Sequence, residues 1–242
     1  PSDTALDRFR QHRYGGDLLK MKKVIIYGVN LQAQALYEMI RREQQAVVEA
    51  FIVDQQYKRG DVLLNLPVYE TQDAFARFSP QNYEICLSFG YKNMVRNREA
   101  KWYECKEKGF QIFTFISKNA NIYSDQIGEG CNVYPGTTIM PFTKIGKGCF
   151  IEAGCTIAHH TEIGDFNFIA PGVHFCGDVI SEKNCFFGGA SEIENGSRIL
   201  EGCFIGAGAK VGKRLPPNSK VLPAKSTISE MRADEMMQHM FK

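Results

Sequence analysis

An apolar residue recurs at every sixth position from Ile127 to Val211, with no insertion that breaks the count. A period of six matches neither the two-residue repeat of a β-strand nor the 3.6-residue repeat of an α-helix. It is expected of a solenoid in which each short strand contributes one large inward side chain before the chain turns. The series is Ile127, Val133, Ile139, Ile145, Ile151, Ile157, Ile163, Ile169, Phe175, Ser181, Phe187, Ile193, Ile199, Ile205 and Val211, with Ser181 the one polar member.

A second series of small or compact residues lies two positions before the first. Residues i and i−2 of a strand point to the same face, so we expect both series to point inward. Its members are Cys131, Thr137, Thr143, Cys149, Cys155, Thr161, Asn167, Val173, Val179, Cys185, Ser191, Ser197, Cys203 and Ala209. Three such strands close a triangular prism, and the segment makes about five coils. We expect tight bends at the glycines that directly follow large members, namely Gly128, Gly146, Gly164, Gly188, Gly206 and Gly212.

The residues before the prism predict alternating strands and helices. Strands are expected over Lys22 to Gly28, Val47 to Asp54, Tyr83 to Gly90 and Gln111 to Ile116, and helices over Gln32 to Arg42 and Asn93 to Gly109. This order is typical of a Rossmann-like domain that binds nucleotides.

The first turn of this domain carries a degenerate dinucleotide fingerprint. Gly28 keeps the first glycine, but Asn30 stands where a second glycine would let a pyrophosphate approach the backbone. An NAD-dependent oxidoreductase is therefore disfavoured, whereas a small α/β domain without a ligand remains an alternative. We expect a nucleotide-linked sugar at the strand ends. The candidate substrate-binding residues are Gly28, Asn30, Leu31, Gln32, Asp54, Gly90 and Lys92.

These patterns predict four regions. They are residues 1–20, a natural extension or an added segment; 21–116, a Rossmann-like domain that binds a nucleotide sugar; 117–225, a parallel β-helix; and 226–242, a helical tail. The four methionines of the tail are typical of a packing or oligomer contact.

Composition adds limits on partners and location. The net charge of +2 gives no reason to expect nucleic acid or an anionic membrane surface as a partner. No apolar run is long enough to span a membrane, and no secretory signal pattern is present. Five of the eight cysteines belong to the small inward series, where they act as compact apolar residues. We therefore expect free thiols and a cytoplasmic protein.

The prism resembles the hexapeptide-repeat acyltransferases, in which it is a left-handed parallel β-helix. The whole arrangement, with His159 four residues before Ile163-Gly164-Asp165-Phe166 and with Ala170-Pro171-Gly172 and Val221-Leu222-Pro223-Ala224-Lys225, is similar to the NeuD/PglD-type sugar acyltransferases. The resemblance implies acetyl transfer from acetyl-CoA to a sugar amine or hydroxyl. It also implies a homotrimer with sites between neighbouring prisms.

By this resemblance His159 is the general base, and the backbone amide of Gly177 faces the thioester. A neutral imidazole, with an ordinary pKa of about 6.5, is suited to take the proton of an attacking amine or hydroxyl. A backbone N–H can stabilise the oxyanion, so neither a metal nor an acyl-enzyme is required. Cys176, next to Gly177, is not expected to act as a nucleophile, because the sequence shows no base to pair with it. The one other histidine of the repeat, His174, leaves a three-histidine zinc site hard to assemble.

The first departure from the family pattern follows the base. His160 replaces an acidic residue, and a neutral His160 is not expected to orient the base or favour its protonated form. Asp178 lies one coil further along, and we expect it to stack close above His160 and supply the missing charge.

The second departure is Phe168, which stands where the family often has another histidine near the thioester. It belongs to a phenylalanine ladder, formed by Phe150, Phe168, Phe186 and Phe204, which are spaced by one coil. An exposed stripe of this kind is unusual on a monomer, so we expect it to be buried between subunits of a trimer. A wall for the pantetheine arm of CoA is the alternative.

The remaining cofactor candidates are Gly189, Ala207, Lys210 and Lys225. By resemblance, small residues let pantetheine run close to the backbone, and lysines near the end of the prism meet the phosphates. The alternative is that these lysines have no ligand and simply form a basic, solvent-exposed end of the prism, which explains any one of them equally well.

The leading hypothesis is an N-acetyltransferase that acts on a UDP- or dTDP-linked amino sugar in surface polysaccharide or glycan biosynthesis. Acetyl-CoA is the cosubstrate, and no metal is needed. A sialic acid-like sugar O-acetyltransferase is the close alternative. A catalytically reduced trimeric binding module is an alternative of a different class.

Overall fold

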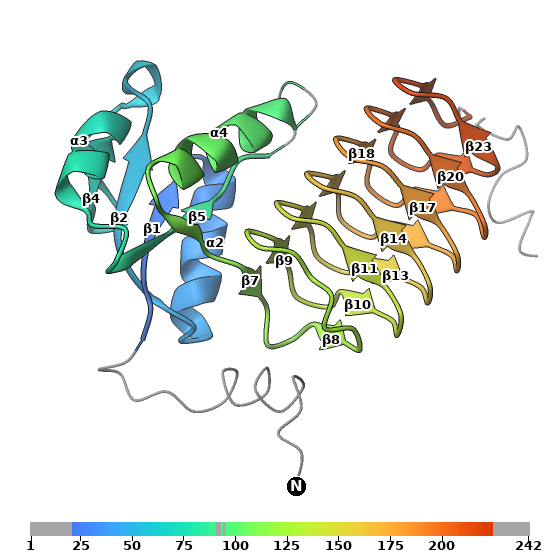
Figure 1. Cartoon of the computed structure of the whole chain (residues 1–242), viewed down its shortest axis with the longest axis horizontal. Helices are drawn as coiled ribbons and strands as arrows, with labels where there is room; N and C mark the ends of the chain where they lie inside the picture. The colour runs from blue at the N-terminus through green and yellow to red at the C-terminus, as the bar shows by residue number, and fades with distance from the viewer. Residues whose placement is uncertain (1–20, 91–92, 94, 225–242) are drawn as a thin grey trace, which may run out of the picture.

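The computed structural model describes residues 21–90, 93 and 95–224, which form an α/β unit followed by a triangular prism (Figure 1). The regions 1–20 and 226–242, together with Lys92 and Lys225, lie outside the described residues. The expected fold class, a Rossmann-like region followed by a left-handed parallel β-helix, is confirmed.

The α/β unit is built on a six-stranded sheet of order β3-β4-β2-β1-β5-β6. Its strands are β1 (Lys23–Tyr27), β2 (Val47–Val53), β3 (Val62–Leu63), β4 (Leu66–Glu70), β5 (Tyr83–Leu87) and β6 (Gln111–Ile112). Its helices are α2 (Leu31–Arg42), α3 (Thr71–Arg77) and α4 (Arg96–Glu107), with a 3-10 turn at Gln55–Tyr57. All strand pairs are parallel except β3–β4. The short elements β3, β4 and α3 carry too few periodic positions to be predicted.

The two faces of this sheet have different neighbours. Val24 and Ile26 of β1 pack with Leu36 of α2 on one face. Ile25 of β1 points the other way and packs with Trp102 of α4. A buried parallel strand must be apolar on both faces, which explains the unbroken Val24-Ile25-Ile26 run.

The predicted strand from Gln111 to Ile116 is wrong as a single element. Gln111–Ile112 pairs with β5 in the α/β sheet, whereas β7 (Phe115–Ile116) pairs with β9 of the prism. The chain therefore passes from one sheet to the other within two residues, and an apolar run gives no sign of that change of partner.

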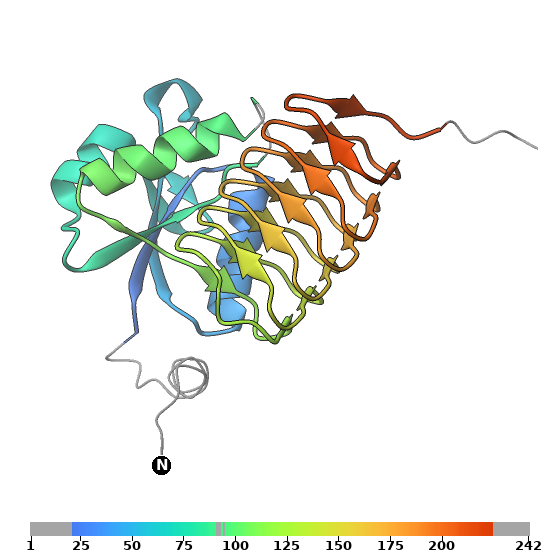
Figure 2. The same ribbon diagram turned by 45° about the vertical axis from the view of Figure 1, so that its right-hand side comes forward.

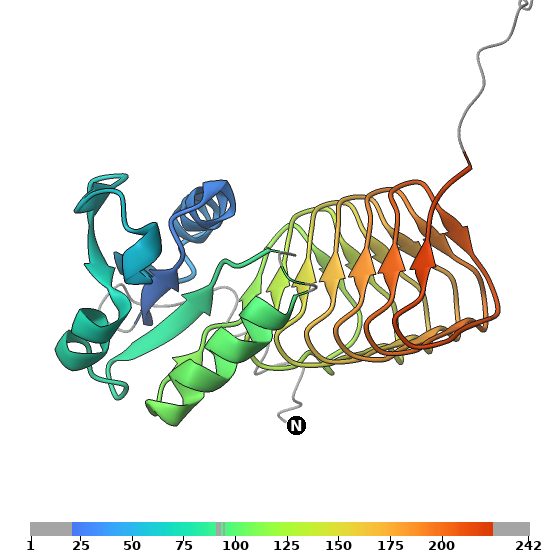
Figure 3. The ribbon, with the colours of Figure 1, turned by 90° about the horizontal axis from the view of Figure 1, so that it is seen from above.

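Three parallel sheets form the prism, and each strand pairs with the strand one coil away (Figure 2). The sheet named here the phenylalanine sheet contains β7, β9 (Asn132–Val133), β12 (Phe150–Ile151), β15 (Phe168–Ile169), β18 (Phe186–Phe187), β21 (Phe204–Ile205) and β24 (Lys220–Val221). The second sheet contains β8 (Asn121–Ile122), β10 (Thr138–Ile139), β13 (Thr156–Ile157), β16 (His174–Phe175), β19 (Glu192–Ile193) and β22 (Lys210–Val211). The third contains β11 (Lys144–Ile145), β14 (Glu162–Ile163), β17 (Ile180–Ser181), β20 (Arg198–Ile199) and β23 (Arg214–Leu215). Figure 3 shows the coils stacked along one axis.

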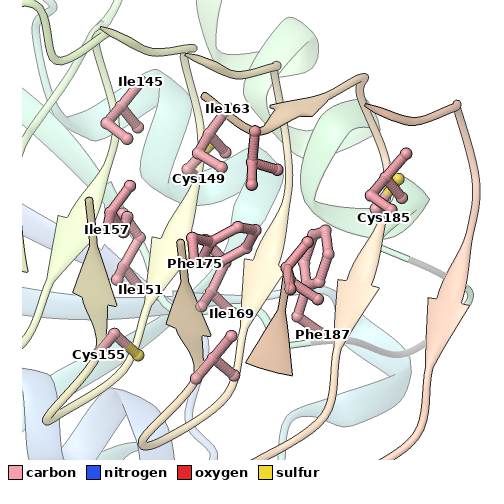
Figure 4. Packing of buried hydrophobic residues seen from close by; sticks show 14 of the residues in the cluster. Ile145, Cys149, Ile151, Cys155, Ile157, Ile163, Ile169, Phe175, Cys185 and Phe187 are labelled. Carbon is pink, nitrogen blue, oxygen red and sulfur yellow. The ribbon is translucent and has the colours of Figure 1, made fainter. Parts of the chain in front are cut away.

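Both predicted inward series lie inside the prism, as Figure 4 shows for ten labelled members. The small series also has a second role, because its threonines, its asparagine and most of its cysteines donate hydrogen bonds to the carbonyl oxygen 15 residues later. Thr143 donates to Ala158 at 3.2 Å, Cys155 to Ala170 at 3.2 Å and Thr161 to Cys176 at 3.0 Å. Cysteine, threonine and asparagine share the small series because each supplies a compact donor.

This hydrogen bond can be tested at Thr143. Thr143→Val keeps the shape of the side chain but leaves the Ala158 carbonyl without that donor. We expect a loss of about 1–3 kcal/mol in the free energy of unfolding. Thr143→Cys is the matched control and should lose less, because Cys149 and Cys155 make the same bond at the next two positions of the small series. Urea unfolding measures both variants, and equal stability of the two would contradict this role of the hydroxyl.

The corners of the prism correct the expected place of the bends. Left-handed backbone occurs two residues after most of the predicted glycines, as at Gly130 with φ 74° and Gly148 with φ 66°. Gly128 instead allows close stacking, since a Cβ there would lie 2.5 Å from the Lys147 nitrogen in the next coil. His160 and Asp178 occupy the left-handed position at φ 60° and 55°, a conformation that histidine and aspartate tolerate better than most residues.

The phenylalanine ladder is stacked as predicted, with ring centroids 4.8–5.6 Å apart. The expected exposure is wrong for its first two members, because Phe150 and Phe168 are 0% and 1% exposed. They belong to the same apolar cluster as Leu36 of α2, so the α/β unit of the same chain covers them. A trimer is not needed to bury them.

Arg98 of α4 joins the two parts of the chain from a fully buried position. Its guanidinium donates to the carbonyl oxygens of Leu87 in β5, at 2.8 Å, and of Gly130 and Gly148 in the prism, at 2.7 and 2.6 Å. Burial lowers the pKa of Arg98 from its usual range. Three carbonyl partners offset part of the cost of burying this charge.

Candidate functional site

Two histidines form one corner of the prism, between β13 of the second sheet and β14 of the third. Both side chains are exposed, because the inward positions of this coil are already filled by Ile157 and Thr161. We call His159 and His160 the histidine corner. Phe142, one coil earlier, places its ring 4.8 Å from the His160 ring and is itself 68% exposed.

The two imidazoles contact each other through one nitrogen each. Nδ1 of His159 lies 3.0 Å from Nδ1 of His160, so a neutral pair shares one hydrogen between them. When His159 donates this hydrogen, its Nε2 keeps a free lone pair. Neutral His160 can therefore hold the base in one tautomer, which corrects the expectation that it cannot. It still provides no negative charge for a protonated His159.

Gly177 lies directly against the free side of the base. A Cβ built on Gly177 would lie 3.0 Å from Cε1 and 3.3 Å from Nε2 of His159, so a side chain here would crowd the ring. Its backbone N–H donates no hydrogen bond to any described residue. The structure thus brings the candidate base and the candidate oxyanion donor together.

Asp178 lies one coil above His160, but its carboxylate has another partner. The Asp178 N–H donates to the His159 carbonyl at 3.1 Å, which confirms the stacking of the two corners. The carboxylate lies 3.3 Å from Nη2 of Arg198, in the next coil, and not within ion-pair distance of either described histidine. The expected charge partner of His160 is therefore not formed in this chain.

A second candidate region lies at the carboxyl ends of β1 and β5. Asn30 replaces the second fingerprint glycine and caps α2, since its Oδ1 accepts from the Ala33 N–H at 2.8 Å. Gly28 adopts φ 126°, and a Cβ there would collide with the Ser88 hydroxyl. Leu31 begins the helix and is 82% exposed. The N–H groups of Leu31 and Gln32 donate to no described residue, and such groups at the start of a helix favour an anion.

Asp54 follows β2 at the same edge of the sheet and is largely engaged by neighbours. Its Oδ1 accepts from Tyr27, from Thr71 at 2.9 Å and from Lys101 at 2.8 Å. Burial alone would raise the pKa of Asp54, but hydrogen bonds from Lys101, Tyr27 and Thr71 outweigh it and leave the pKa below its ordinary value. Oδ2 accepts from no described residue.

The predicted cofactor residues are spread over several parts of the prism. Gly177 lies at the histidine corner, whereas Gly189 and Ala207 lie at the corner between the phenylalanine and second sheets. Lys210 projects from the second sheet and pairs with Glu192 at 3.2 Å and Glu194 at 3.7 Å. Phe168 is buried against the α/β unit and presents no exposed wall.

The base and the strand ends lie on different edges of the prism. Gln32, at the start of α2, contacts the prism at Glu152, which lies at the corner between the phenylalanine sheet and the second sheet. The histidine corner lies between the second and third sheets. Within one chain, His159 and the start of α2 therefore lie at different edges of the prism.

Sequence reasoning missed Glu152 and the residues that support Asp54, namely Tyr27, Thr71 and Lys101. The sequence signal for Glu152 was weak. It is an acidic residue that directly follows the inward Ile151, where the chain leaves the strand. In the described part of the chain, no group of three or more histidine, cysteine, aspartate or glutamate side chains is placed to hold a metal ion. No described helix is long and apolar enough to cross a membrane.

Comparison with known proteins first identifies the class of repeat. Residues 126–159 match the family model of the bacterial transferase hexapeptide, six repeats. No curated protein sequence matches this chain.

Solved structures match the fold over most of the chain. PerB from Caulobacter crescentus, in complex with CoA and GDP-perosamine, is 23% identical, with a TM-score of 0.73 over 82% of this chain and 92% of its own. The acetyltransferase domain of PglB from Neisseria gonorrhoeae, in complex with acetyl coenzyme A, is 19% identical, with a TM-score of 0.73 over 83% and 95%. WeeI from Acinetobacter baumannii is 24% identical, with a TM-score of 0.72 over 82% and 95%. These similarities show a shared fold for both parts of the chain.

Proposed function

We propose that this protein is an acetyl-CoA-dependent N-acetyltransferase that acts on a nucleotide-linked amino sugar in glycan biosynthesis. The observation that carries the proposal is the geometry at His159, whose Nδ1 is paired with His160 while its Nε2 faces Gly177. The bound groups of two proteins of the same fold add support, since one holds acetyl coenzyme A and another holds CoA with GDP-perosamine.

The reaction needs one base and one oxyanion donor. The sugar amine attacks the thioester carbonyl, a C–N bond forms, and Nε2 of His159 takes the proton from nitrogen. The Gly177 N–H stabilises the oxyanion of the tetrahedral intermediate. When the C–S bond breaks, the CoA thiolate leaves and recovers the proton from the imidazolium. No covalent intermediate on the enzyme is required.

A homotrimer completes this site. Because His159 and the strand ends of one chain lie on different edges of the prism, the histidine corner of one copy must serve the nucleotide sugar held by another. The separation of the two regions is thus the argument for a trimer. The phenylalanine ladder no longer supports one, because the α/β unit of the same chain already buries Phe150 and Phe168.

The cytoplasm is the proposed location. None of the eight cysteines, all within the described residues, forms a disulfide, and seven of them are buried. Free buried thiols are ordinary in a reducing compartment.

The function is tested by CoA release from acetyl-CoA with a panel of UDP-, dTDP- and GDP-linked amino sugars and their hydroxyl analogues. We expect turnover with at least one UDP- or dTDP-linked amino sugar and a trimer in sedimentation. Turnover only with hydroxyl sugars would favour O-acetylation. Binding of CoA and nucleotide sugar without any turnover would favour the binding module, and a monodisperse monomer would overturn the shared site.

A further inference from the structure

A polar contact joins the start of α2 to the prism. Nε2 of Gln32 donates to Oε1 of Glu152 at 2.9 Å. Gly90, at the end of β5, makes this contact possible, because a Cβ there would lie 2.5 Å from Oε1 of Gln32. Gln32 therefore lies across the strand end and holds the carboxylate of Glu152 in one position.

The other oxygen of this carboxylate is unused. Oε2 of Glu152 accepts no hydrogen bond from a described residue, although the side chain is only partly exposed. Burial raises the pKa of Glu152, and the Gln32 amide only partly opposes this effect. A carboxylate that has lost much of its water gains more from a bound cation than an exposed one does.

A buried hydroxyl beside Glu152 also lacks a partner. Tyr134 occupies the position equivalent to Glu152 one coil earlier and is 7% exposed. Its hydroxyl has no hydrogen-bond partner among the described residues. Burial, and after it the nearby Glu152 charge, raise the pKa of Tyr134 above its usual range. A buried polar group of this kind ordinarily has a partner, so this corner has unfilled hydrogen-bonding capacity.

The position of Glu152 matches the sugar end of a nucleotide sugar. A diphosphate bound at the start of α2 would lie beside Gln32, whose side chain reaches Glu152. Asp54 follows β2, on one side of β1, whereas Gly90 follows β5, on the other. A nucleoside directed toward Asp54 places the sugar on the side of Gly90 and Glu152.

We propose that Glu152 determines specificity for an amino sugar by binding its ammonium group through Oε2. The bound ammonium releases one proton to solvent before the free amine attacks, and the second proton then passes to His159 as described above. A hydroxyl in the same place offers a hydrogen bond but no charge, so the amino sugar binds more tightly. This inference rests on the proposed function and names the residue that distinguishes N-acetylation from O-acetylation.

The test compares Glu152→Gln with the wild-type protein in direct binding measurements. Glutamine keeps the oxygen that accepts from Gln32 and removes only the charge. We expect Glu152→Gln to bind the nucleotide-linked amino sugar about tenfold to a hundredfold more weakly. Its affinity for the nucleoside diphosphate alone and for the hydroxyl analogue should stay close to wild type. Glu201→Gln, which removes an exposed carboxylate paired with Lys183 at 3.6 Å, is the control and should change none of these affinities.

Two results would overturn the role of Glu152. One is an unchanged preference for the amino sugar in Glu152→Gln. The other is an equal loss of affinity for the nucleoside diphosphate, which would assign Glu152 to holding the α/β unit against the prism. Failure of the proposed function is distinct, because the wild-type protein would then release no CoA with any sugar of the panel.

Discussion

His159→Ala is expected to reduce acetyl transfer by about a hundredfold to ten-thousandfold, the usual contribution of a positioned general base. The exposed ring of His159 packs no core, so the free energy of unfolding should stay close to wild type. The loss should appear mainly in kcat, because the substitution removes the proton acceptor and leaves Gln32, Asp54 and the start of α2 in place. Steady-state CoA release with the best sugar of the panel, together with thermal unfolding, measures both effects.

His160 variants separate the base from its support. His160→Ala removes the ring that receives the Nδ1 hydrogen of His159 and should lower kcat less than His159→Ala does. His160→Asp supplies an acceptor with a negative charge, which favours the protonated form of the base, and should restore activity relative to His160→Ala. Wild-type turnover in His159→Ala would contradict the assignment of the base, whatever the His160 variants do.

Phe168→Ala is expected to lower the free energy of unfolding by about 3–5 kcal/mol, the usual cost of truncating a buried phenylalanine. Phe168 is 1% exposed and packs both on Phe150 and in the cluster that includes Leu36 of α2. The cavity would open between the α/β unit and the prism, so both parts of the chain should lose stability. Chemical denaturation followed by tryptophan fluorescence reports this loss through Trp102 of α4.

Phe204→Ala is the matched control from the same ladder. Phe204 stacks on Phe186 with a centroid distance of 4.8 Å but is only partly buried. Its truncation should cost about 1 kcal/mol, since less apolar area returns to water. Sedimentation should show the same oligomer for both variants. If Phe168→Ala dissociated the protein into stable, fully folded monomers, the ladder would instead be a subunit contact.

Much of the prism could be predicted because its geometry is local. Each large inward residue, such as Ile157, and the small residue two positions before it, such as Cys155, repeat with a period that the strand alternation and the corner impose. The strands β1, β2 and β5 were likewise predicted from apolar runs, since a strand buried on both faces must be apolar throughout.

The candidate site could be predicted only in part. His159 and Gly177 were paired by resemblance, and the stacking of coils brings them together. The partners of polar side chains were not predictable, because a period of one coil places Asp178 above His160 without deciding where its carboxylate points. In the structure, the Asp178 carboxylate pairs with Arg198 in the next coil.

The sequence by itself determined the repeat and the two inward series, and it places His159 and His160 directly after the inward Ile157 and its neighbour Ala158. These features depend on residues within one coil, whose spacing is set by covalent geometry and strand alternation. Only the tertiary structure decided what covers the phenylalanine ladder and which prism residue meets the start of α2. Those contacts join Phe168 to Leu36 and Glu152 to Gln32, residues more than a hundred positions apart in the chain. These contacts depend on how the α/β unit docks on one face of the prism. A repeat in the sequence is local and cannot predict that docking.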